Sequence, residues 1–210
     1  MNTRSRGWLK MAALAPFLVG LAACAGAATT GTPAVKEQPV TESPVQRAVK
    51  ELLANQAAGR VRTLSGAGFV TAPVAVPLAN GEVSLLPLTP DLEAALAPLA
   101  RRWLAGRRQP LPFEVFQTAF LHLTAHRVAV GRAGGEALIR FAPTDDKGRF
   151  SFQQVPEGGW LLVADMSSPV STLLWAVPVE VGTTDSPPLF LVDGNLLLEA
   201  RKPDTPAPAR

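Results

Sequence analysis

The chain has 210 residues, of which 47% are hydrophobic, and it contains 20 prolines and 17 glycines. This size and apolar content fit one β-rich domain between flexible ends. The formal net charge of +3 does not indicate nucleic-acid binding, because the first 23 residues hold Arg4, Arg6 and Lys10 and no acid, and the rest of the chain has as many acidic as basic residues.

The N-terminus has the parts of an export signal. A basic start is followed by an apolar run from Met11 to Ala23. A membrane-spanning helix needs about 20 such residues, whereas the apolar part of a signal peptide needs about 7–15. We therefore predict a signal peptide over residues 1–23 rather than a membrane span.

The single cysteine, Cys24, directly follows Leu21, Ala22 and Ala23. This ending resembles a bacterial lipobox, in which the cysteine thiol takes a diacylglyceryl group. The resemblance implies an exported lipoprotein that is held in the envelope by fatty acids such as palmitate on Cys24. Ala25 stands where Asp often marks inner-membrane retention, so the resemblance implies the outer membrane, facing the periplasm or the cell surface. The alternative is an ordinary signal peptide with an incidental cysteine.

Two terminal segments are predicted to be disordered. Residues 24–44 have no aromatic residue and no apolar period, which is typical of a tether, and residues 201–210 form a Pro-rich tail. Residues 45–58 predict an amphipathic helix, with Ser43 as N-cap and Pro44 at its first position. Its apolar face consists of Val45, Val49, Leu52 and Leu53.

Two further helices are predicted within an insertion over about residues 89–127. Thr89 caps the first of them, Pro90 begins it, and Pro98 is expected to kink it or divide it in two. Its apolar face comprises Leu92, Leu96, Leu99 and Trp103. The second helix carries a stripe that we interpret as core, made of Phe113, Phe116, Phe120 and Leu123.

Alternating apolar residues predict strands on both sides of this insertion. Glu82 and Ser84 are expected to face outward from the strand before it, and Pro178 confines a later strand to an edge or a bulge. Two short strands are predicted about a turn at Asp193 and Gly194. The inward-facing residues are Val83, Leu85, Phe150, Phe152, Trp175, Val177, Val179 and Val181.

Three stretches together resemble the carboxypeptidase regulatory-like domain. They are the stretch from Pro77 to Leu85, the turn and Phe-x-Phe from Thr144 to Phe152, and the Pro-x-Gly and aromatic strand from Val155 to Trp160. The resemblance implies a transthyretin-like (prealbumin-like) Greek-key β-sandwich over residues 59–200 that carries the helical insertion. Trp160 stands where the family usually has Tyr.

The sequence contains no recognisable catalytic constellation. Metallocarboxypeptidases need His-x-x-Glu and a distant His, but the two histidines, His122 and His126, have no Glu at that spacing. Their separation could place both on one helix face, yet a zinc site needs three or four ligands. No Gly-x-Ser-x-Gly elbow, P-loop or dinucleotide motif is present. We predict no enzyme activity, no cofactor and no metal, and structural roles for both histidines.

Arg101, Arg102, Arg107 and Arg108 surround Trp103. This cluster is either a contact patch for anionic lipid or an acidic partner, or a solvated helix end where cations favour the helix dipole. We predict a lipid-anchored envelope protein whose non-catalytic module binds a protein or glycan partner or gives structural support. The alternatives are an enzyme with a site of dispersed residues and a carbohydrate- or peptide-binding accessory lipoprotein.

Overall fold

The computed structural model describes residues 42–71, 74–184 and 187–203. The predicted signal peptide, the lipobox with Cys24 and the tether as far as residue 41 lie outside these residues, as does the predicted tail from residue 204. The described residues all belong to one unit, Thr41–Arg210.

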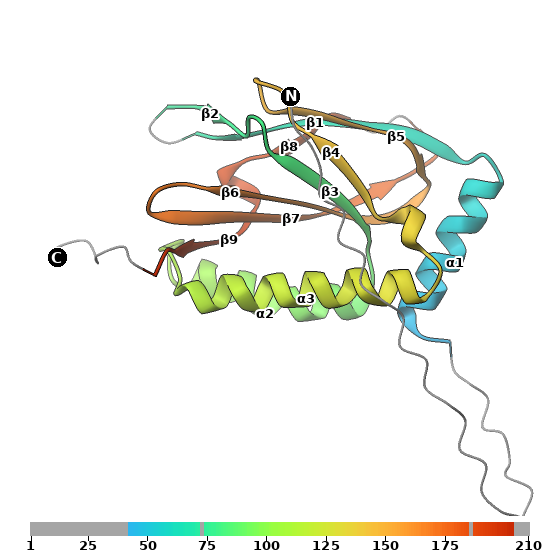
Figure 1. The fold of residues 1–210 in the computed structure, drawn as a ribbon, viewed down its shortest axis with the longest axis horizontal. Coiled ribbons are helices and arrows are strands. Elements are labelled where there is room, and N and C mark those ends of the chain that lie inside the picture. The colour runs from blue at the N-terminus through green and yellow to red at the C-terminus, as the bar shows by residue number, and fades with distance from the viewer. Residues whose placement is uncertain (1–41, 72–73, 185–186, 204–210) are drawn as a thin grey trace, which may run out of the picture. The chain divides into compact units, whose positions relative to one another are not determined.

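Nine strands form two sheets within the described residues (Figure 1). In the first sheet, β1 (Val61–Val70) pairs with β2 (Val76–Pro77), β5 (Arg149–Pro156) and β8 (Leu189–Leu191). The second sheet has the order β4 (Arg140–Pro143), β3 (Glu82–Pro87), β6 (Gly158–Ser167), β7 (Ser171–Val181) and β9 (Leu196–Arg201). All pairings are antiparallel except that of β1 with β8. The predicted β-sandwich is confirmed.

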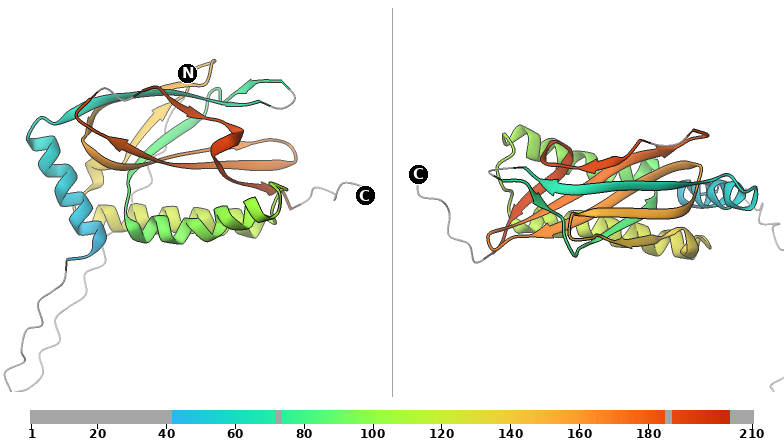
Figure 2. Two further views of the ribbon diagram at one scale, coloured as in Figure 1. Left: turned by 180° about the vertical axis from the view of Figure 1, so that it is seen from behind. Right: turned by 90° about the horizontal axis from the view of Figure 1, so that it is seen from above.

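Three helices surround the sandwich: α1 (Pro44–Ala57), α2 (Pro90–Ala105) and α3 (Phe113–Arg132). Short 3-10 turns follow at Glu136–Leu138 and Asp193–Asn195. Helices α2 and α3 lie side by side against the outer face of the five-stranded sheet, and α1 covers one end of the sandwich (Figures 1 and 2). No helix in the described part of the chain is long and apolar enough to cross a membrane.

The five-stranded sheet is buried on both faces, which explains the three layers. Its strands β3 and β6 contain runs of buried residues rather than a simple alternation. The core between the sheets includes Val83, Leu85, Phe150, Phe152, Trp160, Leu162, Trp175 and Leu191. The core beneath the helices includes Leu86, Leu92, Leu96, Trp103, Ala119, Leu123, Leu161, Val163 and Leu198.

The burial of Ser84 corrects one prediction about β3. Ser84 was expected to face solvent, but it is only 4% exposed. Helix α3 covers this face of the sheet, and the Arg127 guanidinium donates a hydrogen bond of 2.9 Å to the Ser84 hydroxyl. The prediction was wrong because a single strand pattern does not reveal a second covering layer.

The predicted helix starts are confirmed. Ser43 and Gln46 form a capping box at α1, and the Thr89 hydroxyl accepts a hydrogen bond from the Leu92 N–H at α2. Helix α2 is not divided at Pro98. Pro98 and Ala94 are both exposed, so water can bond the Ala94 carbonyl that lacks its helical partner.

The buried face of α3 differs from the predicted stripe. The helix runs beyond the predicted insertion and buries Val115, Ala119, Leu123, His126 and Val130. Phe113 and Phe116 are half-buried, and Phe120 is 50% exposed. Because α3 has apolar residues on several sides, periodicity alone could not identify the face that meets the sheet. The small Ala119, which is fully buried, allows the helix to approach the strands closely.

Two predicted turns connect the sheets. Asp145 accepts hydrogen bonds from the N–H groups of Lys147 and Arg149, and Gly148 has a φ of 72° between β4 and β5. Gly158, with a φ of 134°, follows Pro156 between β5 and β6. Pro178 lies where β7 pairs with β6 alone, so its predicted edge position is also confirmed. Strand β9 extends to Arg201, one residue into the predicted tail.

Candidate ligand-binding site

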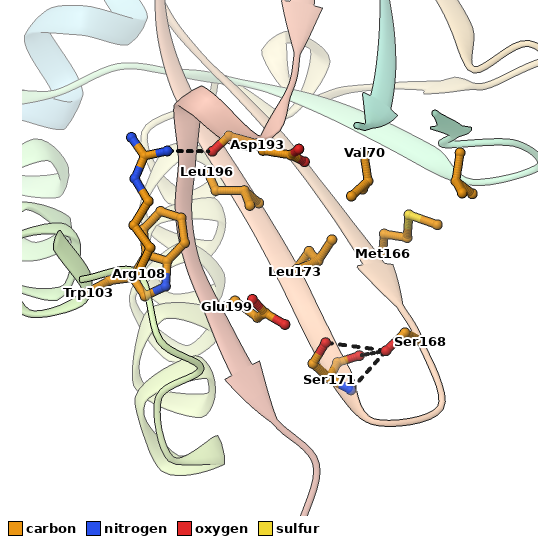
Figure 3. A pocket seen from close by; sticks show the side chains of 11 residues that line it. Val70, Trp103, Arg108, Met166, Ser168, Ser171, Leu173, Asp193, Leu196 and Glu199 are labelled. Atoms are coloured by element: carbon orange, nitrogen blue, oxygen red, sulfur yellow. Dashed lines mark hydrogen bonds between the residues drawn. The ribbon is translucent and has the colours of Figure 1, made fainter. Parts of the chain in front are cut away.

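A cavity of about 530 Å³ has the lining shown in Figure 3. The elements that form it meet at the end of the sandwich opposite α1 (Figure 1). Four separate parts of the chain form it: the paired strands β1 and β2, the hairpin of β6 and β7, the C-terminal end of α2, and the segment from the second 3-10 turn into β9. Its volume lies within the roughly 300–1,000 Å³ typical of small-molecule sites. The lining residues are Val70, Val76, Trp103, Arg108, Met166, Ser168, Ser171, Leu173, Asp193, Leu196 and Glu199.

Trp103 gives the cavity an unpaired hydrogen-bond donor. It lies in the last turn of α2, its side chain is 3% exposed, and its indole Nε1–H has no hydrogen-bond partner in the described residues. Arg107 and Arg108 have φ values of 55° and 59°, which reverse the chain after the helix. The Arg108 guanidinium thereby lies 5.6 Å from the centre of the indole ring, at a cation–π distance.

Asp193 gives the cavity an unpaired acceptor. Its Oδ2 accepts hydrogen bonds from the N–H and the hydroxyl of Thr71, whereas its buried Oδ1 has no partner in the described residues. The turn that carries it is fixed by two contacts: Asn195 Oδ1 accepts from the Val192 N–H, and Trp175 Nε1 donates to the Val192 carbonyl. Asp193 is therefore held rigidly with one oxygen unused.

The remaining polar side chains of the lining differ in whether they are already hydrogen-bonded within the protein. Ser168 and Ser171 bond each other and the backbone within the turn between β6 and β7, as Figure 3 shows. Glu199 comes from β9, directly opposite Leu173 in the strand pairing, and its side chain is half-buried. The two serines shape the wall, while Asp193, Glu199, Trp103 and Arg108 provide its chemistry.

A second cavity of about 340 Å³ lies between α3 and the five-stranded sheet. It contains Arg127, Glu82 and Asp165. Desolvation raises the pKa of Asp165 above its usual range, against the opposing effect of the Arg127 charge. Since Arg127 already bonds Ser84 and lies over the Phe141 ring, we interpret this group as structural.

The predicted arginine cluster is divided by the structure. Arg101, Arg102 and Arg107 are exposed and lie outside the cavity lining, whereas Trp103 is buried and offers no open aromatic face. The predicted place of Trp103 on the apolar face of α2 is confirmed, so its ring does not lie open between the arginines. The Trp103 side chain packs in the core beneath the helices. Of the four arginines around it, only Arg108 also lines the cavity. A contact role for the exposed arginines stays a prediction.

The two histidines have different environments. His122 is exposed, whereas His126 is 7% exposed and its Nε2 lies 2.8 Å from the Pro87 carbonyl oxygen, which fits an Nε2–H donor. Desolvation lowers the pKa of His126, against the opposing effects of this hydrogen bond and of Asp91. No group of three or more metal-ligating residues occurs in the part of the chain that the structure describes.

This pKa shift predicts a pH dependence of stability. The folded state favours neutral His126, so its stabilising effect is complete above the unfolded pKa of about 6.5 and is lost as the pH falls below it, because the unfolded chain then binds the proton more readily. His126→Gln should reduce the fall in the free energy of unfolding between about pH 7 and pH 5. Urea unfolding at several pH values measures this. His122→Gln is the exposed control, and equal slopes in both variants would contradict the prediction.

No protein family and no curated protein sequence matches this chain. Among solved structures, a protein from Pseudomonas aeruginosa that has been proposed to bind carbohydrate is similar over 63% of this chain and 90% of its own, with 18% identity and a TM-score of 0.37. The pilus backbone protein RrgB from Streptococcus pneumoniae is similar over 58% of this chain and 35% of its own, with 14% identity and a TM-score of 0.27. At these levels we transfer no ligand, activity or assembly from either protein. The resemblance to the carboxypeptidase regulatory-like domain stays a prediction.

Proposed function

We propose that this protein is a lipid-anchored component of the bacterial envelope that binds a saccharide in the 530 Å³ cavity. One observation supports the ligand class above all others: two residues of the cavity lining hold a buried donor, Trp103 Nε1–H, and a buried acceptor, Asp193 Oδ1, that have no partner in the described residues. Buried polar groups without partners are uncommon in folded proteins, because each costs about 1–3 kcal/mol. Both atoms are closed to a water molecule, so the proposal requires small side-chain movements that let a bound ligand supply both partners and offset this cost.

Sugar hydroxyls meet these requirements better than other groups do. Each hydroxyl can accept from the Trp103 N–H or donate to the Asp193 carboxylate. The carbon face of a sugar ring can lie against the apolar wall, which includes Leu173 and Leu196. An apolar ligand would leave both buried atoms unpaired. An anion would be repelled by the carboxylates of Asp193 and Glu199 and attracted only by the Arg108 guanidinium. A simple cation would leave the Trp103 N–H without an acceptor.

The proposed location rests on the residues before Cys24. Leu21, Ala22 and Ala23 provide the lipobox, and a thioether-linked diacylglycerol would keep the domain at an envelope membrane. A saccharide ligand in that compartment is a glycan of the envelope. The proposed role is binding rather than catalysis, because Thr71 occupies one oxygen of the Asp193 carboxylate.

Asp193→Asn tests the ligand assignment. The amide oxygen can keep the contacts to Thr71, while its NH₂ group replaces the unused oxygen, so an acceptor becomes a donor without a change of shape. We expect at least tenfold weaker saccharide binding, since a hydrogen bond to a charged group contributes about 1.5–3 kcal/mol. Glycan arrays with residues 41–210 would identify the saccharide, and calorimetry would then measure its affinity.

Asp146→Asn is the matched control, because Asp146 is exposed in the turn between β4 and β5 and lies outside the cavity lining. The Asp146→Asn variant should bind the saccharide with the same affinity as the wild type. Equal saccharide affinities in the wild type, Asp193→Asn and Asp146→Asn would show that Asp193 does not contact the ligand. Binding of peptides but not saccharides would overturn the ligand class, and hydrolysis of the bound saccharide would overturn the non-catalytic role.

A further inference from the structure

Helix α3 carries an apolar ridge along the flank of its buried face, which we define as Phe113, Phe116, Phe120 and Leu121. The ring centres of Phe113 and Phe116 are 5.5 Å apart, those of Phe116 and Phe120 are 6.3 Å apart, and both pairs are stacked. Phe120 is 50% exposed and Leu121 is 66% exposed. Phe113 and Phe116 are half-buried against the core beneath the helices, and Phe120 also lines the second cavity, so the solvent-exposed part of the ridge consists mainly of Leu121 and one half of Phe120.

Exposed cations lie near one end of this ridge. A short connection joins α2 to α3, and the two helices lie side by side, so the C-terminal turns of α2 are next to the first turns of α3 (Figure 1). These last turns of α2 hold Arg101 and Arg102, both exposed. Glu114 is the acid on this part of α3, whereas the acids of α2, Asp91 and Glu93, lie at its other end. The ridge is thus apolar with a mainly basic margin.

The N-terminal chain joins the domain on the same side. The first turn of α1, at Pro44, lies level with the layer of α2 and α3, while the other end of α1 lies at the level of the four-stranded sheet (Figures 1 and 2). The chain that follows the proposed lipid anchor therefore enters the domain at the level of the helical layer.

We propose that the ridge on α3 is a membrane-docking surface whose occupant is a bilayer that contains anionic lipid. Phe120 and Leu121 insert at the boundary of headgroups and acyl chains, as the apolar faces of interfacial helices do, and Arg101 and Arg102 contact lipid phosphates. Contiguous exposed apolar surface of this kind marks an interaction site more often than a free surface. The choice of a bilayer as occupant rests in part on the proposed lipid anchor, whereas the docking does not involve the saccharide cavity, so docking and saccharide binding can each fail without the other.

Vesicle binding by residues 41–210 tests the docking, because this unit contains both hydrophobic cores and lacks Cys24. We expect it to co-sediment with vesicles of phosphatidylethanolamine and phosphatidylglycerol. Replacing Phe120 and Leu121 by serine should weaken this partitioning about tenfold or more, since two large apolar side chains no longer leave water. The matched control is Phe190→Ser, because Phe190 is 54% exposed on β8 in the other sheet.

A second vesicle experiment tests the role of the positive charges of Arg101 and Arg102. Replacing Arg101 and Arg102 by serine should weaken binding several-fold to vesicles with phosphatidylglycerol and leave it unchanged on vesicles of phosphatidylcholine alone. Lys147→Ser, an exposed lysine in the turn between β4 and β5, should bind as the wild type does. Absence of vesicle binding by the wild type, or equal loss in the Phe120 and Phe190 variants, would overturn the proposal. Self-association in ultracentrifugation that the Phe120 variant abolishes would instead identify a second copy as the occupant and would also overturn it.

Discussion

Phe152→Ala is expected to lower the free energy of unfolding by about 3–5 kcal/mol, the usual cost of replacing a buried Phe by Ala. Phe152 lies in β5, is 4% exposed and faces the five-stranded sheet across the main core. Its ring meets that of Phe150 edge to face, with ring centres 6.0 Å apart. The substitution removes this contact and leaves a cavity between two rigid sheets, which cannot close around the smaller side chain.

This loss is large compared with the roughly 5–15 kcal/mol that stabilises a typical domain. In residues 41–210 we expect the melting temperature to fall on the order of 10 °C. Phe190→Ala provides the matched control, because Phe190 is 54% exposed and lies in the same sheet, on β8. Its melting temperature should stay within a few degrees of the wild type. A shift of only a degree or two in Phe152→Ala would contradict the place of β5 in the core.

The parts of the fold that could be predicted are those in which local chemistry and tertiary packing favour the same arrangement. Phe150 and Phe152 alternate with polar residues on a strand whose other face is open to solvent, so a period of two identifies the buried side. Helices α1 and α2 begin at Ser43 and Thr89, whose side chains bond the first free N–H groups whatever the rest of the chain does. Predictions from such signals hold in the folded protein because they depend only on residues that are close in the sequence.

Strand β1 carries weaker local signals, and no strand was predicted there. It contains Gly66 and Gly68, which lower its strand propensity. The structure shows why Gly66 is needed: a Cβ atom at this position would lie 2.2 Å from the Leu189 carbonyl oxygen of β8 and 2.6 Å from the Phe150 ring. The glycine serves a close contact with residues far away in the sequence, and that requirement is invisible in the local pattern.

The candidate site was the least predictable feature. The sequence predicts Trp103 on a helix face and Asp193 in a turn, but no sequence pattern relates the two. They meet because the end of α2 and the turn before β9 lie at the same end of the sandwich. The same reasoning explains the ridge on α3: Phe120 is apolar like the core residues, and only the packing of Ala119 and Leu123 on the sheet shows that half of its side chain stays exposed.

Membrane attachment should depend almost entirely on Cys24. We propose that its thiol carries a diacylglyceryl group after cleavage behind Ala23. Each buried CH₂ contributes about 0.8 kcal/mol, and two or more chains hold a protein on a membrane where one chain binds only marginally. Cys24→Ser removes the attachment point with the smallest possible change of side chain. We expect the variant to leave the detergent phase and to remain as a soluble species or an unprocessed precursor.

Intact mass and detergent partitioning of the expressed full-length protein measure this outcome. Ala25→Asp is the matched control, because it keeps the thiol and the lipobox: this variant should stay lipid-anchored, although the lipobox resemblance implies that it is retained in the inner membrane. The ridge on α3 adds a weak and reversible contact, so any Cys24→Ser protein left on membranes should be released by Phe120→Ser. An unmodified Cys24 thiol in wild-type protein extracted from membranes would contradict the anchor, and the ridge alone would then have to account for the attachment.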